Sequence, residues 1–167
     1  MAVDSSTAQS IQRFRIDWVL NNDLAIGPAP RAERHILRLK AAGINAVLSL
    51  CSEEEAQPPQ GLTEQFQCQR LVLPDHRSSD VMTLFQLNSS LLALEELHQH
   101  GPVFVHCVAA VERSPLVCMG WLIKKHKLSP TESIDYLMQI HRGTNPLPGQ
   151  FALLQQLNQN PANSTES

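Results

Sequence analysis

Short runs of apolar residues alternate along this chain with longer segments of helical periodicity, and this alternation restricts its fold more than any other feature. The apolar runs lie at 44–50, 71–73 and 103–105. The segments of helical spacing lie at 31–42, 81–100 and 115–125. Branched apolar runs of this length indicate buried strands. The alternation predicts a single α/β domain with a central, mostly parallel sheet flanked by helices, in which ligands favour the carboxyl ends of the strands.

The two ends of the domain add a hairpin and two more helices. Apolar stretches at 14–19 and 24–26 are separated by polar turn residues, which predicts an opening hairpin. A capping signal at 129–132 starts a helix that we expect to reach residue 140, and a last helix begins near Pro148. The apolar positions that mark the helices are Ile36, Leu37, Leu39, Met82, Phe85, Leu91, Leu92, Leu97, Phe151, Leu153, Leu154 and Leu157.

Size and charge exclude several classes of function. The chain has 167 residues, of which 43% are hydrophobic, enough for one core and too few for two full domains. The formal charge of −3 lacks the basic excess that drives binding to nucleic acid or to anionic membranes. No apolar run approaches a membrane span, and the first residues do not resemble a signal peptide. We therefore expect a cytoplasmic monomer with a flexible segment at 1–12, a folded domain at 13–158 and a disordered tail at 159–167.

The cysteines do not indicate a disulfide framework or a metal site. The four lie at positions 51, 68, 107 and 118 without a CxxC pair, and the histidines are scattered. We interpret Cys51, Cys68 and Cys118 as inert small hydrophobic residues, and we expect no metal and no cofactor. An acidic run at 53–55 is interpreted as a solvated surface loop without a function.

Cys107 differs because of its surroundings. It follows the strand at 103–105, and five residues separate it from Arg113, which lies just before the helical segment at 115–125. A loop of this length can curl so that its amide N–H groups face inward, and the helix adds its positive N-terminal end, so the loop suits a phosphate dianion. The same field favours the thiolate of Cys107, and Arg113 can hold two phosphate oxygens in a planar fork.

The segment His106-Cys107-Val108-Ala109-Ala110-Val111-Glu112-Arg113-Ser114 resembles the HCX5R signature of the cysteine-dependent protein tyrosine phosphatases. Asp75, in the sequence LPDHRS, lies 32 residues before Cys107, an order that resembles the dual-specificity phosphatases. The likeness covers about residues 14–158 and is greatest to compact bacterial proteins, including cyanobacterial ones. It implies the protein tyrosine phosphatase fold, no cofactor, and a phosphorylated protein or small aryl phosphate as substrate.

The resemblance also implies a role for each matching residue. Cys107 would attack phosphorus, while Arg113 and the loop of Val108, Ala109, Ala110, Val111 and Glu112 would bind the phosphate oxygens. Asp75 would protonate the leaving group and later activate water, which requires a pKa near the working pH. Ser114 would assist departure of the thiolate, and His106 would fix the loop without acting as a general base.

Several alternatives remain open at this level. Asp80 competes with Asp75 as the acid, although it also resembles the N-cap of a helix that begins at Val81. The family commonly has glycine where this chain has Ala110, and a positive φ there would strain the loop. The loop has no lysine, and Glu112 would repel highly charged head groups, which disfavours phosphoinositides.

Two other function classes use the same loop. A pseudophosphatase would bind phosphorylated partners through the altered loop without turning them over. A redox protein would pair Cys107 with a resolving thiol at Cys118 or Cys68, but no CxxC motif supports this alternative.

Overall fold

A five-stranded sheet forms the centre of the molecule. The computed structural model describes residues 13–159, and its strands run in the order β1-β2-β5-β3-β4. They are β1 (Asp17–Leu20), β2 (Leu24–Gly27), β3 (Ala46–Ser49), β4 (Gln67–Arg70) and β5 (Val103–His106). β1 pairs antiparallel with β2, and every other pair is parallel. The predicted α/β class with a mostly parallel sheet and an opening hairpin is confirmed.

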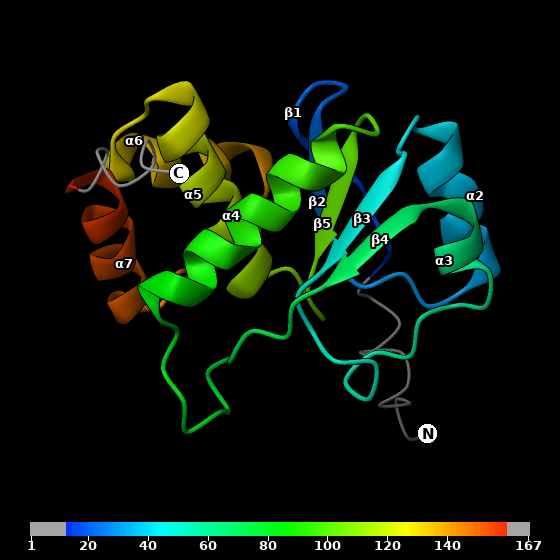
Figure 1. Ribbon diagram of the computed structural model, residues 1–167, viewed down its shortest axis with the longest axis horizontal. Coiled ribbons are helices and arrows are strands. Elements are labelled where there is room, and N and C mark those ends of the chain that lie inside the picture. The colour runs from blue at the N-terminus through cyan, green and yellow to red at the C-terminus, as the bar shows by residue number, and fades with distance from the viewer. Residues whose placement is uncertain (1–12, 160–167) are drawn as a thin grey trace, which may run out of the picture.

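Helices cover both faces of this sheet (Figure 1). One face carries α2 (Glu33–Ala41) and the short α3 (Leu62–Gln65). The other face carries α4 (Leu84–His98), α5 (Arg113–His126), α6 (Pro130–Ile140) and α7 (Pro148–Gln159). Side chains of β5 alternate between the two cores, because Val103 and Val105 pack on the four-helix side and Phe104 packs on the α2 side.

The central position of β5 determines where the Cys107 loop lies. Its last residue, His106, pairs with Gly27 of β2 on one side and with Ser49 of β3 on the other. All four residues of β5 are buried. The loop that follows therefore leaves the carboxyl edge in the middle of the sheet, where ligand sites of α/β domains are commonly found.

The prediction of a strand at 71–73 is wrong in position, because the strand lies a few residues earlier in the sequence. The ladder partner of β3 is instead β4, whose residues Gln67–Arg70 are partly exposed and carry polar side chains. Leu71 and Leu73 still donate backbone hydrogen bonds to Ser49 and Leu50 beyond the ladder. An edge strand with little buried surface needs no apolar run, so its sequence resembles that of a loop.

The helix predicted from Val81 begins later, at Leu84. Thr83 is the N-cap: its hydroxyl accepts from the Gln86 N–H at 3.1 Å, and the Gln86 side chain accepts from the Thr83 N–H at 2.9 Å. This capping box excludes Asp80 as the N-cap. Asp80 instead donates its backbone N–H to Ser78.

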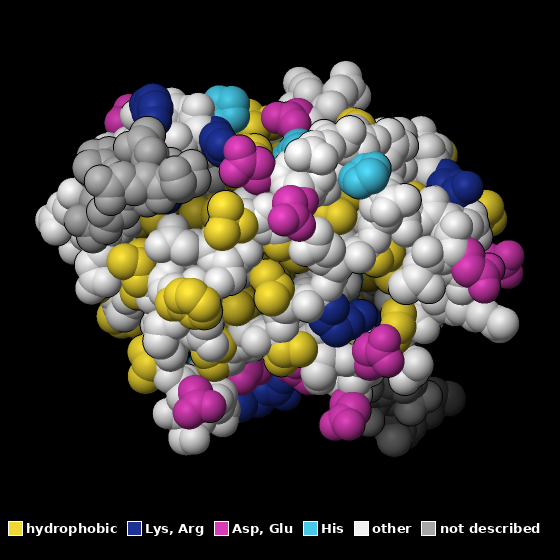
Figure 2. Space-filling model, in the orientation of Figure 1, with side chains coloured by type: hydrophobic (Ala, Val, Ile, Leu, Met, Phe, Trp, Pro, Cys, Tyr) yellow, Lys and Arg dark blue, Asp and Glu magenta, His cyan; other side chains and the backbone are white. Residues whose placement is uncertain are grey.

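Three apolar positions that mark the predicted helices lie in solvent. Leu37, Phe85 and Leu92 are 62%, 80% and 62% exposed, so the helical spacing does not identify the buried face at these positions. Hydrophobic side chains gather on the face of the molecule that carries α4 (Figure 2). Phe151 is half-buried, whereas Leu153, Leu154 and Leu157 enter the core as expected.

The remaining helix boundaries agree closely with the predictions. Ser129 and Glu132 form the expected capping box, with Pro130 at the first helical position, and α6 ends at Ile140. α5 begins two residues before the predicted start, and α7 continues through Gln159, which was assigned to the tail. The flexible segment predicted at 1–12, and the tail from 160 onward, lie outside the described residues.

Between residues 13 and 159, no helix is long and apolar enough to cross a membrane.

Candidate active site

The loop after β5 forms one wall of a cavity of about 300 Å³. Residues from two separate loops line it: Asp75, His76, Arg77, Cys107, Val108, Ala109, Val111, Glu112 and Arg113. Cys107 and Arg113, whose spacing suggested a phosphate site, therefore face one space together with Asp75. Of the other predicted residues, Ser114, His106 and Ala110 are buried around this cavity without lining it.

Backbone groups of the loop are divided between the surrounding protein and the cavity side. The carbonyls of Val108 and Val111 accept from the N–H groups of Ala29 and Asn145, each at 3.0 Å, and the carbonyl of Ala110 accepts from His141. The N–H groups of residues 108–112 donate no hydrogen bond within the described part of the chain. Five amide donors thus remain for an anion at the start of α5, where the helix dipole is positive.

Cys107 is buried at the base of this loop. Its Sγ lies 3.2 Å from the Oγ of Ser114, in the first turn of α5, and both residues are almost fully buried. A hydroxyl at this distance can donate a hydrogen bond to a thiolate.

His106 orients the base of the loop in its neutral form. Burial, together with the charges of Arg70 and Arg113, lowers the pKa of His106 to about 4, although the bond to the Cys107 carbonyl opposes the shift. Nδ1 lies 2.9 Å from that carbonyl oxygen and therefore donates to it. The neutral ring then accepts at Nε2 from the hydroxyl of Ser49, 2.7 Å away. Both ring nitrogens are occupied, so neither is free to take a proton from substrate.

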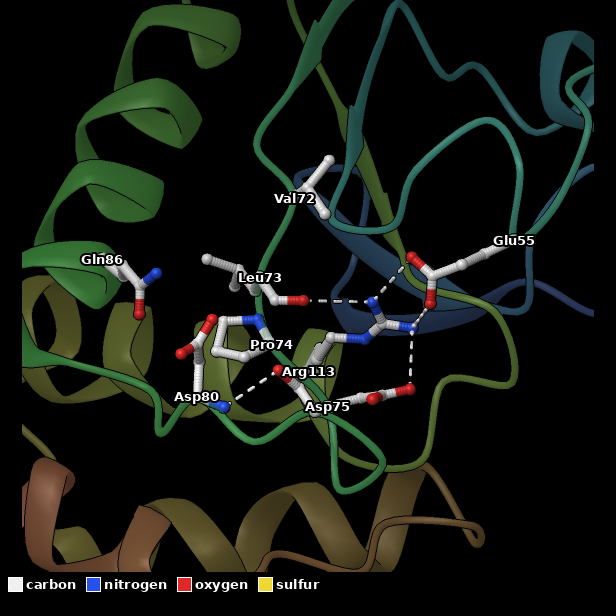
Figure 3. Close-up of a pocket in the computed structure, with 9 residues that line it drawn as sticks. Glu55, Val72, Leu73, Pro74, Asp75, Asp80, Gln86 and Arg113 are labelled. Atoms are coloured by element: carbon white, nitrogen blue, oxygen red, sulfur yellow. Dashed lines mark hydrogen bonds and ion pairs between the residues drawn. The ribbon is translucent and has the colours of Figure 1, made fainter.

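The Arg113 guanidinium is held by groups from two segments, the one that carries Glu55 and the one that carries Leu73 and Asp75 (Figure 3). Its Nη1 and Nη2 donate to the two carboxylate oxygens of Glu55 at 3.2 and 3.0 Å, and Nη1 also contacts the carbonyl of Leu73 at 3.2 Å. Burial lowers the pKa of Arg113, but the hydrogen bonds and charge of Glu55 raise it more, so the group stays charged. Its Nε is buried and has no partner within residues 13–159. One N–H of the fork is therefore available to an anion.

The interpretation of the acidic run as a solvated loop is wrong for Glu55. Its side chain is 24% exposed, and the carboxylate bonds to Arg113 from 58 residues away. Burial raises the pKa of Glu55, but the hydrogen bonds from Arg113 and Ser52 outweigh this and lower it. A pairing between positions so distant has no local sequence signal.

Asp75 lies beside this arginine and is bound by a second one. Arg77 contacts Oδ2 through Nε at 2.9 Å and through Nη2 at 2.8 Å, and its backbone N–H donates to Oδ1 at 3.0 Å. Partial burial raises the pKa of Asp75, but the bonds from Arg77 and the charge of Arg113, 3.9 Å away, lower it overall. The expectation of a pKa near the working pH is therefore not met in this geometry, because Arg77 stabilises the carboxylate.

The competing acid, Asp80, lies elsewhere. It lines a second cavity of about 320 Å³, together with Glu55, Asp75 and Gln86 (Figure 3). Asp80 does not line the cavity that contains Cys107, whereas Asp75 lines both. Proximity to the cysteine therefore favours Asp75.

One group of potential metal ligands occurs among residues 13–159. Ligand atoms of Asp75, His76 and Glu112 lie within 4.8 Å of one another. The Glu112 Oε1 accepts from the backbone N–H of His76 at 2.9 Å and lies 3.0 Å from its Nδ1, while Arg77 binds Asp75. These hydrogen bonds account for the cluster without an ion, and they show that Glu112 joins the Cys107 loop to the Asp75 loop.

The other cysteines do not lie at the cavity. Cys51, Cys68 and Cys118 are free thiols, and burial raises the pKa of each. None of them lines the space that Cys107 faces. A resolving thiol for Cys107 therefore has no support in this geometry.

Residues 25–160 match the family model described as "Dual specificity phosphatase, catalytic domain". Dual specificity protein phosphatase PHS1 of Arabidopsis thaliana is 30% identical over 118 residues, which cover 71% of this chain and 13% of the relative. Dual specificity protein phosphatase 1 of Homo sapiens is 26% identical over 117 residues, which cover 70% of this chain and 30% of the relative. The chain thus spans less than a third of the length of these relatives.

The fold agrees with this match. A crystal structure of PTPMT1 in complex with PI(5)P superposes with a TM-score of 0.76 at 22% identity, covering 90% of this chain and 99% of that one. This likeness confirms the fold implied by the sequence motif. The chain belongs to the dual specificity phosphatase catalytic domain family.

Proposed function

We propose that this chain hydrolyses phosphomonoesters through a cysteinyl-phosphate on Cys107. The observation that carries the proposal is the set of donors in the Cys107 loop: the N–H groups of 108–112 and the buried Nε of Arg113, none of which has a partner within residues 13–159. Fixed donors of this kind stabilise the charge on a phosphoryl group as it transfers. The family match supports the same activity.

In the first step the Cys107 thiolate attacks phosphorus, an S–P bond forms, and the bond from phosphorus to the leaving oxygen breaks. Protonated Asp75 gives its proton to that oxygen. In the second step the Asp75 carboxylate takes a proton from water, whose oxygen attacks phosphorus and displaces the thiolate. Ser114 Oγ, 3.2 Å from the sulfur, donates a hydrogen bond to the departing thiolate.

The acid step needs a protonated Asp75, which Arg77 opposes in the structure. A bound phosphate dianion supplies negative charge near this carboxyl, and like charge raises the pKa of an acid. It also competes for Arg113, whose charge stabilises the carboxylate. Substrate binding thereby moves Asp75 toward the protonated form that the reaction consumes.

The cavity walls favour a substrate with an apolar group next to the phosphate. Val108, Ala109 and Val111 line it beside Glu112, whose carboxylate adds a negative charge. An aromatic ring gains contact with these side chains, whereas a head group with several phosphates is repelled by Glu112. We therefore favour phosphotyrosine or phosphoserine/threonine in proteins, or small aryl phosphates, over the phosphoinositide class bound in the PTPMT1 structure.

Steady-state hydrolysis of para-nitrophenyl phosphate, without metal and with reductant, tests the proposal. The wild type should turn over, Cys107→Ser should lose turnover while still binding inorganic phosphate, and Asp75→Asn should be slower. Folded wild-type protein without turnover, or Cys107→Ser with turnover intact, would contradict it.

A second candidate, a phosphate-binding pseudophosphatase, is favoured by one observation. Ala110 has φ 59, a left-handed conformation that glycine adopts without strain, and alanine there costs about 1–2 kcal/mol. If this strain holds the loop away from the reactive geometry, phosphate binds to the folded wild type without hydrolysis. Ala110→Gly would then restore turnover.

A further inference from the structure

His141 lies behind the Cys107 loop, on the side away from the cavity. It caps the C-terminus of α6, and 1% of its surface is exposed. Its Nε2 is 2.6 Å from the carbonyl oxygen of Ala110, and its Nδ1 is 2.6 Å from Oδ2 of Asp17 in β1. The ring thus joins the first strand to the strained residue of the loop across 31 positions of sequence.

The two partners fix the direction of the hydrogen bonds of the ring. The Ala110 carbonyl only accepts, so Nε2 donates to it. Nδ1 faces Oδ2 of Asp17, which Arg15 Nε also contacts at 3.2 Å, and this contact holds the ring in place. His141 is therefore a buried donor to the loop backbone, oriented by Asp17.

The carbonyl that His141 holds belongs to a residue with an unfavourable backbone conformation. Ala110 combines φ 59 with complete burial, so its side chain cannot relieve the conformation by moving into solvent. If the peptide between Ala110 and Val111 rotates, the carbonyl leaves His141 and the Val111 N–H turns with it. The Val111 N–H is one of the unpaired donors available to phosphate. Its direction thus depends on the bond to His141.

We propose that His141 is a positioning residue: its ring, oriented by Asp17, donates a hydrogen bond to the Ala110 carbonyl and holds Ala110 in the left-handed conformation that directs the loop amides at phosphate. The inference rests on the proposed function of this loop in binding phosphate. Asn145, in the same segment, provides a second anchor through its bond to the Val111 carbonyl. The α6–α7 connection and β1 therefore stabilise a loop geometry that the alanine alone disfavours.

A double-mutant cycle between His141 and Ala110 tests this role. His141→Gln keeps a side chain of similar length but has no second nitrogen to face Asp17 while it donates to Ala110, so inorganic phosphate should bind about tenfold more weakly, and kcat/KM should fall in parallel. In the Ala110→Gly background the left-handed conformation needs no support, so the same change should cost less than about twofold. His126→Gln, at the exposed far end of α5, is the matched control and should change neither value.

Equal losses of phosphate affinity in both backgrounds would show that His141 supports only the fold. No loss in either background would show that His141 has no role. Each of these results would overturn the inference.

If His141→Gln does not fold, Asp17→Asn replaces it in the same cycle, and we expect a smaller loss that Ala110→Gly again removes. Nitrogen NMR of the wild type should show a proton on Nε2 of His141, and an Nε2 without a proton would contradict the proposal. Phosphate binding is measured without turnover, so an inactive wild type would contradict the proposed hydrolysis and leave this test intact.

Discussion

The two loops that meet at the cavity are held in very different ways. The Cys107 loop is anchored from behind by bonds to Ala29, His141 and Asn145, and its carbonyls are engaged in the surrounding protein. The segment 74–83 is exposed from residue 76 to 81, and most of its hydrogen bonds are local, such as those of Arg77 to Asp75. It is linked to the other loop by the contact of His76 with Glu112 and by the ion pair of Asp75 with Arg113 at 3.9 Å.

This difference fits the chemistry that we propose for each loop. Donors that stabilise a phosphoryl group act best when they are fixed before the reaction, because they then need no reorganisation. In the proposed reaction Asp75 changes its protonation twice in each cycle and approaches two different oxygens. A locally bonded, exposed segment permits such movement at little cost. The anchored loop should therefore respond to mutation mainly through binding and catalysis together, and the other segment through the pH dependence.

The largest effect is expected from Arg113→Lys in the anchored loop. Lysine keeps the charge but cannot form the planar fork to Glu55 and phosphate at once, so kcat/KM for para-nitrophenyl phosphate should fall about 10³-fold. Arg34→Lys, at an exposed position of α2, is the control and should leave the rate unchanged. A decrease of less than about tenfold would show that a point charge suffices and that the fork geometry is unimportant.

Asp75→Asn should come next, with a decrease in kcat of about 10²–10³ for alkyl phosphates. The amide cannot supply a proton, so the basic limb of the pH–rate profile should disappear. Asp80→Asn is the matched control from the same segment and should retain both the rate and the limb. The opposite pattern, with loss in Asp80→Asn, would assign the acid to the neighbouring cavity.

Glu55→Gln should reduce kcat/KM by roughly 10–100-fold, because a hydrogen bond to a charged group contributes about 1.5–3 kcal/mol. Glutamine retains one acceptor for Arg113 but loses the charge and the second oxygen. Glu54→Gln, its exposed neighbour, should behave as wild type. Equal rates for the two variants would show that Glu55 contributes no more to catalysis than an exposed surface residue does.

The smallest effect on rate is expected from Arg77→Gln. Arg77 lowers the pKa of Asp75, so its removal raises that pKa and keeps the acid protonated to higher pH. The basic limb of the pH–rate profile should therefore move upward, with less than about a threefold change in rate at the optimum. A limb that stays in place or moves downward would show that Arg77 does not control the acid.

Local patterns in the sequence were enough to predict most of the secondary structure and half of the candidate site. The loop from Cys107 to Arg113 and the capping box of α6 are each formed by residues that are close together in the sequence. A local sequence pattern is therefore enough to predict them. The start of α4 was placed wrongly because Asp80 and Thr83 are both acceptable caps, and only the bond pattern with Gln86 distinguishes them.

Contacts between distant positions could not be predicted in this way. Glu55 reaches Arg113 across 58 residues, and Asp17 reaches His141 across 124, through a fold that brings four loops to one sheet edge. A glutamate in an acidic run and a histidine after a helix look like surface residues in the sequence. Ala110 is the intermediate case, because its departure from glycine predicted strain but not the histidine that opposes it.

The most direct test of the account is a rapid acid quench of the enzyme during turnover of para-nitrophenyl phosphate, followed by mass spectrometry of the peptide that contains Cys107. The account predicts a phosphorylated Cys107, with more of it in Ser114→Ala, because loss of the hydroxyl 3.2 Å from the sulfur slows breakdown of the intermediate. Turnover with no phosphate on Cys107 in either protein, or with phosphate on another residue, would contradict it.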